Sequence, residues 1–314
     1  MEKPLVSLCI YTYKQENFVR ETLEAAVAQD YPNLEILVSD DCSPDNTFGV
    51  IQEFAKQYNG PHKLIVNRNH LNLGIGGNVM KLFSMSHGVY IVNNCGDDLS
   101  IPNRVSRSVE AIQKEQVDNM SFAMSPFGAS VAKTGFFTDE IEKTERYTIE
   151  DYIKGSYRSS GASRIMTRRI VDFFGPLNSD CPTEDSTFTF RSFLLGGLAY
   201  SYEHLVKYRI HGENTSIGAT YFKRIKPEPI YRQYLTDLKI AQEKGLVTED
   251  LYKSLIEKFN MYLERETSLR EVYFAGGYVK RGIKLSKMLL SNKIHRKTKK
   301  ILLRSYCSWI KNNI

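Results

Sequence analysis

The sequence has little of what marks secreted or membrane-spanning proteins. Its five cysteines are scattered, odd in number and form no Cys-x-x-Cys pair, which argues against a disulfide framework or a zinc site and for a reducing compartment. No apolar run approaches the roughly 20 residues that span a bilayer. The first four residues lack the basic and apolar regions of a secretory signal. We therefore expect a globular cytoplasmic protein.

Acidic residues are absent from the end of the chain, residues 272–314, called the basic tail below. Eleven of the 42 Lys and Arg residues lie there, whereas the rest of the chain carries 31 basic and 36 acidic residues. The net charge of +6 is therefore concentrated in the basic tail, which predicts an anionic partner for this segment.

A helix over residues 299–311 would place five apolar side chains on one face: Leu302, Leu303, Tyr306, Trp309 and Ile310. A basic amphipathic helix of this kind suits an anionic membrane surface. The alternative is a helix packed on the domain with its charges in water. Nucleic-acid binding is not expected, because no recognition motif accompanies the charge.

Strand and helix signals alternate in the first half of the chain, which predicts a mainly parallel sheet flanked by helices. The apolar runs that predict strands are 5–11, 34–39, 64–66, 89–93, 121–126, 164–169 and 198–202. A helix is expected over 79–86 and another over 183–195, and residues 127–147 are expected to form a surface loop. Helices over 230–244, 248–266 and 279–312 would make the last third a helical extension.

Two of the predicted strands end in adjacent aspartates, Asp40-Asp41 and Asp97-Asp98. Parallel strands bring their carboxyl ends to one edge of a sheet, where α/β proteins bind ligands. We therefore expect one acidic site that could hold a metal ion and a phosphate. The alternative is that these residues only end strands and cap helices. The Gly-rich segment 74–78 lacks the Lys-Ser/Thr of a phosphate loop and by itself indicates a turn that opens a helix.

In order, these pieces resemble the motifs of the family-2 glycosyltransferases from about residue 5 to residue 216. The matching segments are 6–13 (VSLCIYTY), 38–43 (VSDDCS), 72–78 (Asn-x-Gly-x-x-x-Asn), 88–98 (GVYI to GDD), 183–185 (TED) and 208–216 (YRIHGEN-x-S). The resemblance implies the GT-A fold, a Rossmann-like α/β architecture with a mainly parallel sheet. It implies a nucleotide-sugar-binding and catalytic domain over 1–218, followed by a helical, basic C-terminal extension over 219–314.

The resemblance also implies roles for donor binding. Tyr11 and Tyr13 would lie against the nucleotide base, where an aromatic ring can stack, and Asp41 would accept from a base N–H. Asn78 belongs to the same donor-binding set. Strand packing for the tyrosines and a turn role for Asp41 are the alternatives.

The implied metal site is built on Asp98, which would bind Mg²⁺ or Mn²⁺ directly. Asp97 would contact the ribose or a metal-bound water, and His211 would reach the metal or the diphosphate, with Arg209 shaping its loop. The chain departs from the family's Asp-x-Asp-Asp pattern, because Cys95 stands at the first acid.

Glu184 and Asp185 match the family's base motif, with Asp185 as the general base and Glu184 in support. Thr183 is the expected N-cap, which would put Asp185 in the first turn of a helix, where the helix dipole favours the ionised form. The alternative is that two acids merely satisfy the helix N-terminus.

The resemblance implies an inverting hexosyl- or N-acetylhexosaminyl-transferase that uses a nucleotide-diphosphate sugar, and a UDP-sugar is the expected donor. The expected acceptor is a saccharide or a lipid-linked saccharide in cell-surface polysaccharide biosynthesis, at the inner face of the cell membrane. Two alternatives remain. A nucleotidyltransferase would normally carry a Gly-rich loop after the first strand, whereas residues 13–17 contain no glycine. A non-catalytic sugar-nucleotide-binding protein would not need both Asp98 and Asp185.

Overall fold

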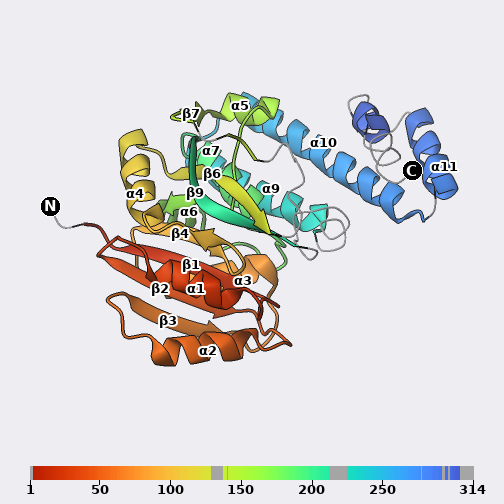
Figure 1. Ribbon diagram of the computed structural model, residues 1–314. Coiled ribbons are helices and arrows are strands. Elements are labelled where there is room, and N and C mark those ends of the chain that lie inside the picture. The colour runs from red at the N-terminus through yellow and green to blue at the C-terminus, as the bar shows by residue number, and fades with distance from the viewer. Residues whose placement is uncertain are drawn as a thin grey trace. The chain divides into compact units, whose positions relative to one another are not determined.

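A computed structural model describes residues 3–128, 137–139, 141–211, 225–276, 278–291, 294–295 and 298–304. The chain forms two compact units, residues 1–217 and 218–314 (Figure 1).

The first unit contains a nine-stranded sheet in the order β3-β2-β1-β4-β8-β6-β9-β5, with β7 paired to β9. The strands are β1 (Val6–Thr12), β2 (Leu34–Asp40), β3 (Lys63–Arg68), β4 (Tyr90–Cys95), β5 (Leu99–Ser100), β6 (Asn119–Gly128), β7 (Thr144–Tyr147), β8 (Ile165–Thr167) and β9 (Leu198–Ile210). Strands β1 to β4 are parallel, as predicted. Beyond β4 the sheet is mixed, because β8 runs antiparallel to both β4 and β6.

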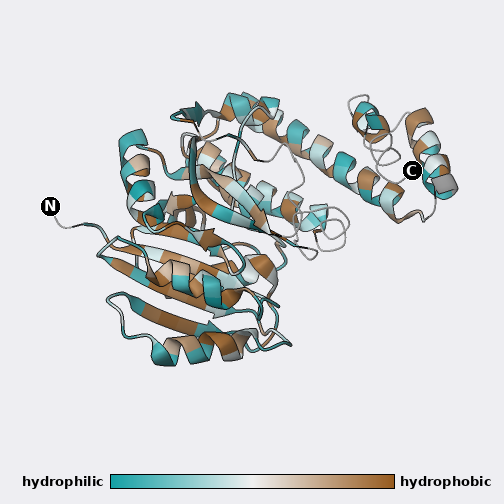
Figure 2. Cartoon of the chain, viewed as in Figure 1, coloured by the Kyte–Doolittle hydropathy of each residue, from teal (hydrophilic) through white to brown (hydrophobic). Residues whose placement is uncertain are grey.

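Seven helices of this unit are described: α1 (Val19–Val27), α2 (Thr47–Gln57), α3 (Gly74–Met85), α4 (Arg104–Glu115), α5 (Ile149–Lys154), α6 (Arg169–Phe174) and α7 (Asp185–Leu194). Hydrophobic residues are concentrated in the central strands (Figure 2), as expected for parallel strands that are buried on both faces.

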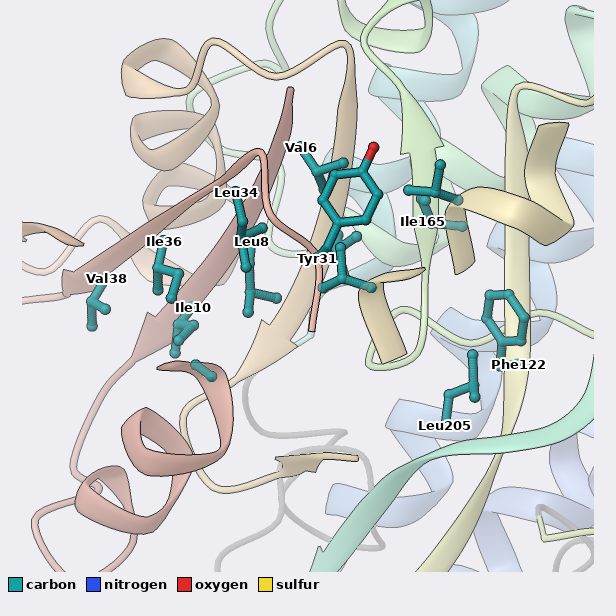
Figure 3. Close-up of a cluster of buried hydrophobic side chains, with 14 of the residues drawn as sticks. Val6, Leu8, Ile10, Tyr31, Leu34, Ile36, Val38, Phe122, Ile165 and Leu205 are labelled. Carbon is teal, nitrogen blue, oxygen red and sulfur yellow. The ribbon is translucent and has the colours of Figure 1, made fainter. Parts of the chain in front are cut away.

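Successive side chains of β1 point to opposite faces of the sheet and enter two different hydrophobic clusters. Leu8 and Ile10 belong to a cluster that includes residues of α1, α2 and α4. Figure 3 shows them beside Leu34 and Ile36 of β2. Cys9 lies in the other cluster, with residues of α3, α6 and α7. This second face is the one that carries α7 and its acidic N-terminus.

Three local expectations about the first unit are corrected. Helix α3 begins at Gly74, so the Gly-rich segment is the first turn of the helix and not a turn before it. The strand predicted over 164–169 is only the three-residue β8, and α6 follows at once. The loop predicted over 127–147 includes the end of β6 and all of β7, while residues 129–136 and 140 lie outside the described part.

The second unit contains α9 (Pro227–Glu243), α10 (Glu249–Phe274) and α11 (Tyr278–Leu290), and residues 298–304 are also helical. The single helix predicted over 279–312 is wrong, because α11 ends at Leu290 and Ser291 is not helical. This break lets Leu302 pack with Val272, Leu285 and Met288 in a small hydrophobic cluster. No helix among the described residues is long and apolar enough to cross a membrane.

The described part of the basic tail does not present the predicted apolar face as one surface. Leu302 is 1% exposed, whereas its neighbour Leu303 is 47% exposed. The other three residues of that face (Tyr306, Trp309 and Ile310) lie outside the described residues.

Candidate active site

The carboxyl ends of β2, β1 and β4 lie next to one another at one edge of the sheet. In the strand register Tyr11 is paired with Ser39 on one side and with Cys95 on the other. The residues that follow these strand ends, Asp41 and Asp97-Asp98, therefore start from neighbouring positions.

Asp98 is buried beside the end of β9. Its Oδ1 accepts a hydrogen bond from the backbone N–H of Arg209 at 2.9 Å. No residue in the described part of the chain donates to Oδ2, although Asp98 is only 1% exposed. Burial and the charge of Asp97 raise the pKa of Asp98 well above its ordinary value. A buried carboxylate oxygen that has no protein donor is available to a cation.

The end of β9 and the next residue, His211, reach the same aspartates. Nε2 of His211 lies 2.8 Å from Oδ2 of Asp97, and the Arg209 side chain donates through Nε to the Asp97 carbonyl at 2.9 Å. The Arg209 guanidinium also lies over the rings of Phe18 and Phe127, 4.9 and 4.4 Å from their centroids. His211 and Arg209 thus contact the aspartate pair although more than 110 residues separate them along the chain.

Cys95 completes this cluster. Potential ligand atoms of Cys95, Asp97 and Asp98 all lie within 4.8 Å of one another, and Sγ of Cys95 lies 3.1 Å from the hydroxyl of Tyr11. Two carboxylates, one of which has an unpaired buried oxygen, and a thiol form a donor set that fits a divalent cation.

Arg104 lies behind the aspartates, and sequence reasoning did not identify it. It is fully buried and donates to the Asn93 carbonyl, the Asn94 side chain, the Ser100 hydroxyl and the Ala162 carbonyl. Burial lowers the pKa of Arg104 to about 10. In the sequence, Arg104 stands out only as a charged residue at a position of α4 that faces the sheet.

The two aspartates at the end of β2 have different environments. Asp40 is fully buried, accepts from the Ser43 N–H at 3.0 Å and lies 3.5 Å from Arg68. Asp41 accepts at Oδ1 from Asn69 Nδ2 and from the Leu73 N–H, at 2.9 and 2.8 Å. The expectation of one acidic site formed by both pairs is therefore too broad, because Asp40 serves the loop that follows β2.

Asn78 uses its side-chain amide inside the protein. Oδ1 accepts from the Ser39 hydroxyl at 2.6 Å and from Asn69 at 3.0 Å, and Nδ2 donates to the Ser39 carbonyl at 3.0 Å. Asn78 is only 3% exposed. These bonds fix α3 to the end of β2.

Tyr13, in contrast, is 36% exposed beyond the end of β1.

Helix α7 presents Asp185 in its first turn, as predicted. The N-cap residue is Glu184 and not Thr183, although the Thr183 hydroxyl accepts from the Asp185 N–H at 3.4 Å. The Asp185 side chain is 49% exposed, and its Oδ1 accepts from Nη2 of Arg164 at 2.7 Å. Arg164 itself is fully buried and also donates to the Asp185 carbonyl at 3.1 Å. A Cβ at Gly161 would lie 2.9 Å from Asp185 Cγ, so any larger residue there would displace the Asp185 side chain.

Glu184 lies beneath Asp185 and is 2% exposed. Burial and the charge of Asp185 raise the pKa of Glu184 to about 7. Burial also raises the pKa of Tyr11, and the charges of Cys95, Glu184 and Asp185 add to that shift. Tyr11, near the end of β1, is therefore within electrostatic reach of the acidic N-terminus of α7.

The part of the chain that contains β2 to β8 matches a family of sugar-transferring enzymes. The sequence profile described as Glycosyl transferase family 2 matches residues 7–170, which is more than half of the chain. The protein belongs to this family.

Relatives of similar length carry the same assignment. An uncharacterised glycosyltransferase of Haemophilus influenzae is 26% identical over 307 residues, which cover 86% of this chain and 90% of that protein. EpsE of Bacillus subtilis, whose name assigns it provisionally to the glycosyltransferases, is 33% identical over 113 residues. That match covers only 36% of this chain and 40% of EpsE.

Solved structures show the same fold. Staphylococcus aureus TarS 1–349, crystallised with UDP-GlcNAc, has a TM-score of 0.61 at 17% identity, and the match covers 91% of this chain and 80% of that one. The mannosyltransferase PcManGT of Pyrobaculum calidifontis, in complex with GDP-Man and Mn²⁺, has a TM-score of 0.57 at 14% identity, with coverages of 98% and 84%. At these identities the likeness establishes the GT-A fold.

Proposed function

We propose that the protein is an inverting, metal-dependent glycosyltransferase that moves a sugar from a nucleotide-diphosphate donor to an acceptor hydroxyl. The observation that carries the proposal is the position of Asp185. Its half-exposed carboxylate is held by a buried arginine at a helix N-terminus. The charge of Asp185 acts on Tyr11, whose hydroxyl contacts Cys95 of the cluster that suits a metal.

Asp185 is the proposed general base. An ionised carboxylate can take the proton of an acceptor hydroxyl as that oxygen attacks the anomeric carbon. Oδ1 is bound by Arg164, so Oδ2 is the oxygen left to face the acceptor. The first turn of α7 further favours the negative charge. Arg164 acts as a positioning residue, because it fixes the direction of the carboxylate without reaching the acceptor.

Donor recognition is assigned to the end of the sheet at β1 and β2. Both described hydrogen bonds of Asp41 go to Oδ1, which leaves Oδ2 for a base N–H. Tyr13 is exposed enough to stack on a base, and Tyr11 lines the same edge. Asn78 supports this site indirectly, since its amide is used to fix α3. A UDP-sugar is the proposed donor, and TarS was crystallised with one.

The diphosphate of the donor would lie beside Asp97, Asp98 and His211. Asp98 is the proposed direct ligand of Mg²⁺ or Mn²⁺, through the oxygen that no described residue pairs. Such a cation stabilises negative charge on the departing diphosphate. His211 and Arg209 hold the end of β9 at this site. PcManGT was solved with Mn²⁺.

The second unit is proposed to bring the enzyme to an anionic membrane that carries a lipid-linked saccharide acceptor for polysaccharide synthesis. Helix α11 exposes Ile283 and Leu290, which are 52% and 83% exposed. The same helix carries Lys280, Arg281 and Lys287 and no acidic residue. Exposed apolar residues among basic ones suit the headgroup region.

The test is a thermal-unfolding screen of UDP-, GDP- and dTDP-sugars with and without Mn²⁺, followed by a transfer assay with the best donor. Binding to the folded state raises the apparent stability. We expect one nucleotide-sugar to stabilise the protein in a metal-dependent way and to release its nucleoside diphosphate during turnover. Stabilisation without turnover in any acceptor mixture would instead favour a non-catalytic binding protein. Formation of a nucleotide-sugar from a sugar phosphate would favour a nucleotidyltransferase.

A further inference from the structure

A thiol stands among the carboxylates of the proposed metal site. Ligand atoms of Cys95, Asp97 and Asp98 lie within 4.8 Å of one another, so one cation could contact the sulfur and a carboxylate together. Cys95 occupies the position of the first acid in the family's Asp-x-Asp-Asp pattern. This metal site is part of the proposed function, on which the role of Cys95 therefore rests. That role concerns the kind of ion that the site selects.

A second observation points to a ligand at this place. Asp98 is 1% exposed, yet no donor in the described ranges reaches its Oδ2. A buried, unpaired carboxylate oxygen is unfavourable unless a ligand completes it. The acidic cluster is therefore built to receive a partner that the protein does not supply.

The surroundings of Cys95 suit a metal-bound sulfur. The hydroxyl of Tyr11 lies 3.1 Å from Sγ and can donate a hydrogen bond to it, as outer-shell groups commonly do for metal ligands. Cys95 as a residue is only partly buried.

We propose that Cys95 is a direct ligand of the divalent cation and shifts the preference of the site from Mg²⁺ toward thiophilic ions such as Zn²⁺ and Co²⁺. Mg²⁺ takes oxygen ligands and binds sulfur poorly. Thiolate ligands favour softer ions, and Zn²⁺ readily accepts mixed sulfur and oxygen coordination. An aspartate at residue 95 would offer only oxygen and would leave Mg²⁺ competitive.

The experiment uses Cd²⁺ as a probe, because a Cd–S bond gives an ultraviolet charge-transfer absorption that oxygen ligands do not. The full-length protein is titrated with Cd²⁺, with and without UDP, and compared with Cys95→Ser and Cys95→Asp. Cys42→Ser is the matched control, since Cys42 is also partly buried but lies outside the cluster. Thermal unfolding of each variant verifies that it folds.

We expect the wild type and Cys42→Ser to show the absorption, with one saturating Cd²⁺ per chain. It should vanish in Cys95→Ser, where Cd²⁺ affinity falls at least about tenfold, since even the loss of an outer-shell partner costs about 10–100-fold. Cys95→Asp should lose the absorption and bind Mg²⁺ more tightly than the wild type.

The proposal is overturned if the wild type binds Cd²⁺ without the absorption, binds none, or shows the same absorption after Cys95→Ser. Asp98→Asn separates this result from the fate of the proposed function. If Asp98→Asn abolishes Mn²⁺ binding while Cys95→Ser changes neither Mn²⁺ nor Cd²⁺ binding, the metal site stands and sulfur ligation is wrong. If Asp98→Asn leaves Mn²⁺ binding intact, the assigned metal site itself is wrong.

Discussion

Replacing Asp185 with asparagine should reduce both turnover and stability, because this carboxylate is the proposed base and also the charge partner of a buried arginine. The substituted side chain keeps an oxygen that can accept from Nη2 of Arg164, which lies 2.7 Å from Oδ1 in the wild type. What the substitution removes is the negative charge. Nucleotide binding should stay largely intact, since only the acceptor is activated there.

The size of the stability effect follows from the exposure of the pair. Breaking a fully buried ion pair on one side costs about 3–5 kcal/mol. Arg164 is fully buried, but the Asp185 side chain is 49% exposed, so water screens the pair and a hydrogen bond survives. We therefore expect a loss of about 1–2 kcal/mol in the free energy of unfolding. At roughly 2–4 °C per kcal/mol, Tm should fall by several degrees. Transfer should fall by about 10²–10⁴-fold, the usual contribution of a general base.

A double-mutant cycle tests the ion pair directly. Arg164→Met added to Asp185→Asn removes the uncompensated buried charge, so we expect it to recover most of the lost stability and none of the activity. Asp172→Asn is the matched control, since Asp172 is exposed in the first turn of α6. Wild-type turnover of Asp185→Asn at saturating substrates would refute the base assignment. An unchanged Tm of Asp185→Asn, or further destabilisation by Arg164→Met, would refute the role of the ion pair.

Three further predictions concern other parts of the molecule. The folded-state pKa of Glu184 is raised to about 7, so the protonated carboxyl stabilises the folded state. This contribution is fully present below the pKa of Glu184 in the unfolded chain and is lost as pH rises through about 7. Denaturant unfolding at pH 5 and pH 8 should show this loss, up to roughly 3 kcal/mol, and Glu184→Gln should abolish it; equal pH profiles would contradict the burial effect. Asp98→Asn should abolish the metal-dependent rise in Tm that nucleotide causes. It should also stabilise the ligand-free protein, because it relieves the repulsion with Asp97. If nucleotide still raised Tm only in the presence of Mn²⁺, Asp98 would not be a metal ligand. A protein truncated after Gly276 should no longer sediment with anionic vesicles at low salt, since basic residues near such a surface contribute about 1 kcal/mol each to binding. Equal sedimentation of the truncated and the full-length protein would mean that the basic tail only packs within the protein.

Local sequence pattern predicted the framework of the first unit well. The first four parallel strands were predicted because each is a short apolar run, and the segments between them carry apolar residues at helical spacing. Both patterns are visible within a few consecutive residues. The placement of Asp185 in the first turn of α7 could be predicted for the same reason. Errors arose where packing overrides local preference. The helix predicted over 279–312 breaks after Leu290, and Leu302 is buried against Val272.

The pairing of charged groups in the site could not be read from the sequence. Asp40 and Asp41 look equivalent along the chain, but burial assigns Asp40 to Ser43 and Arg68. Arg164 and Arg104 carry no motif, although one holds Asp185 and the other lies behind the aspartates.

By itself the sequence determined the family, the first four parallel strands and the residues that carry the proposed chemistry, because these depend on local periodicity and on motifs in a fixed order. Only the tertiary structure decided which of those residues meet. The contact between Asp97 and His211 depends on the path of β9 back to the edge where β4 ends. The unpaired oxygen of Asp98 and the thiol beside it likewise depend on which donors strand order and burial leave within reach. Hydrogen bonds and charges act over a few ångströms in space, and distance along the chain does not fix that separation.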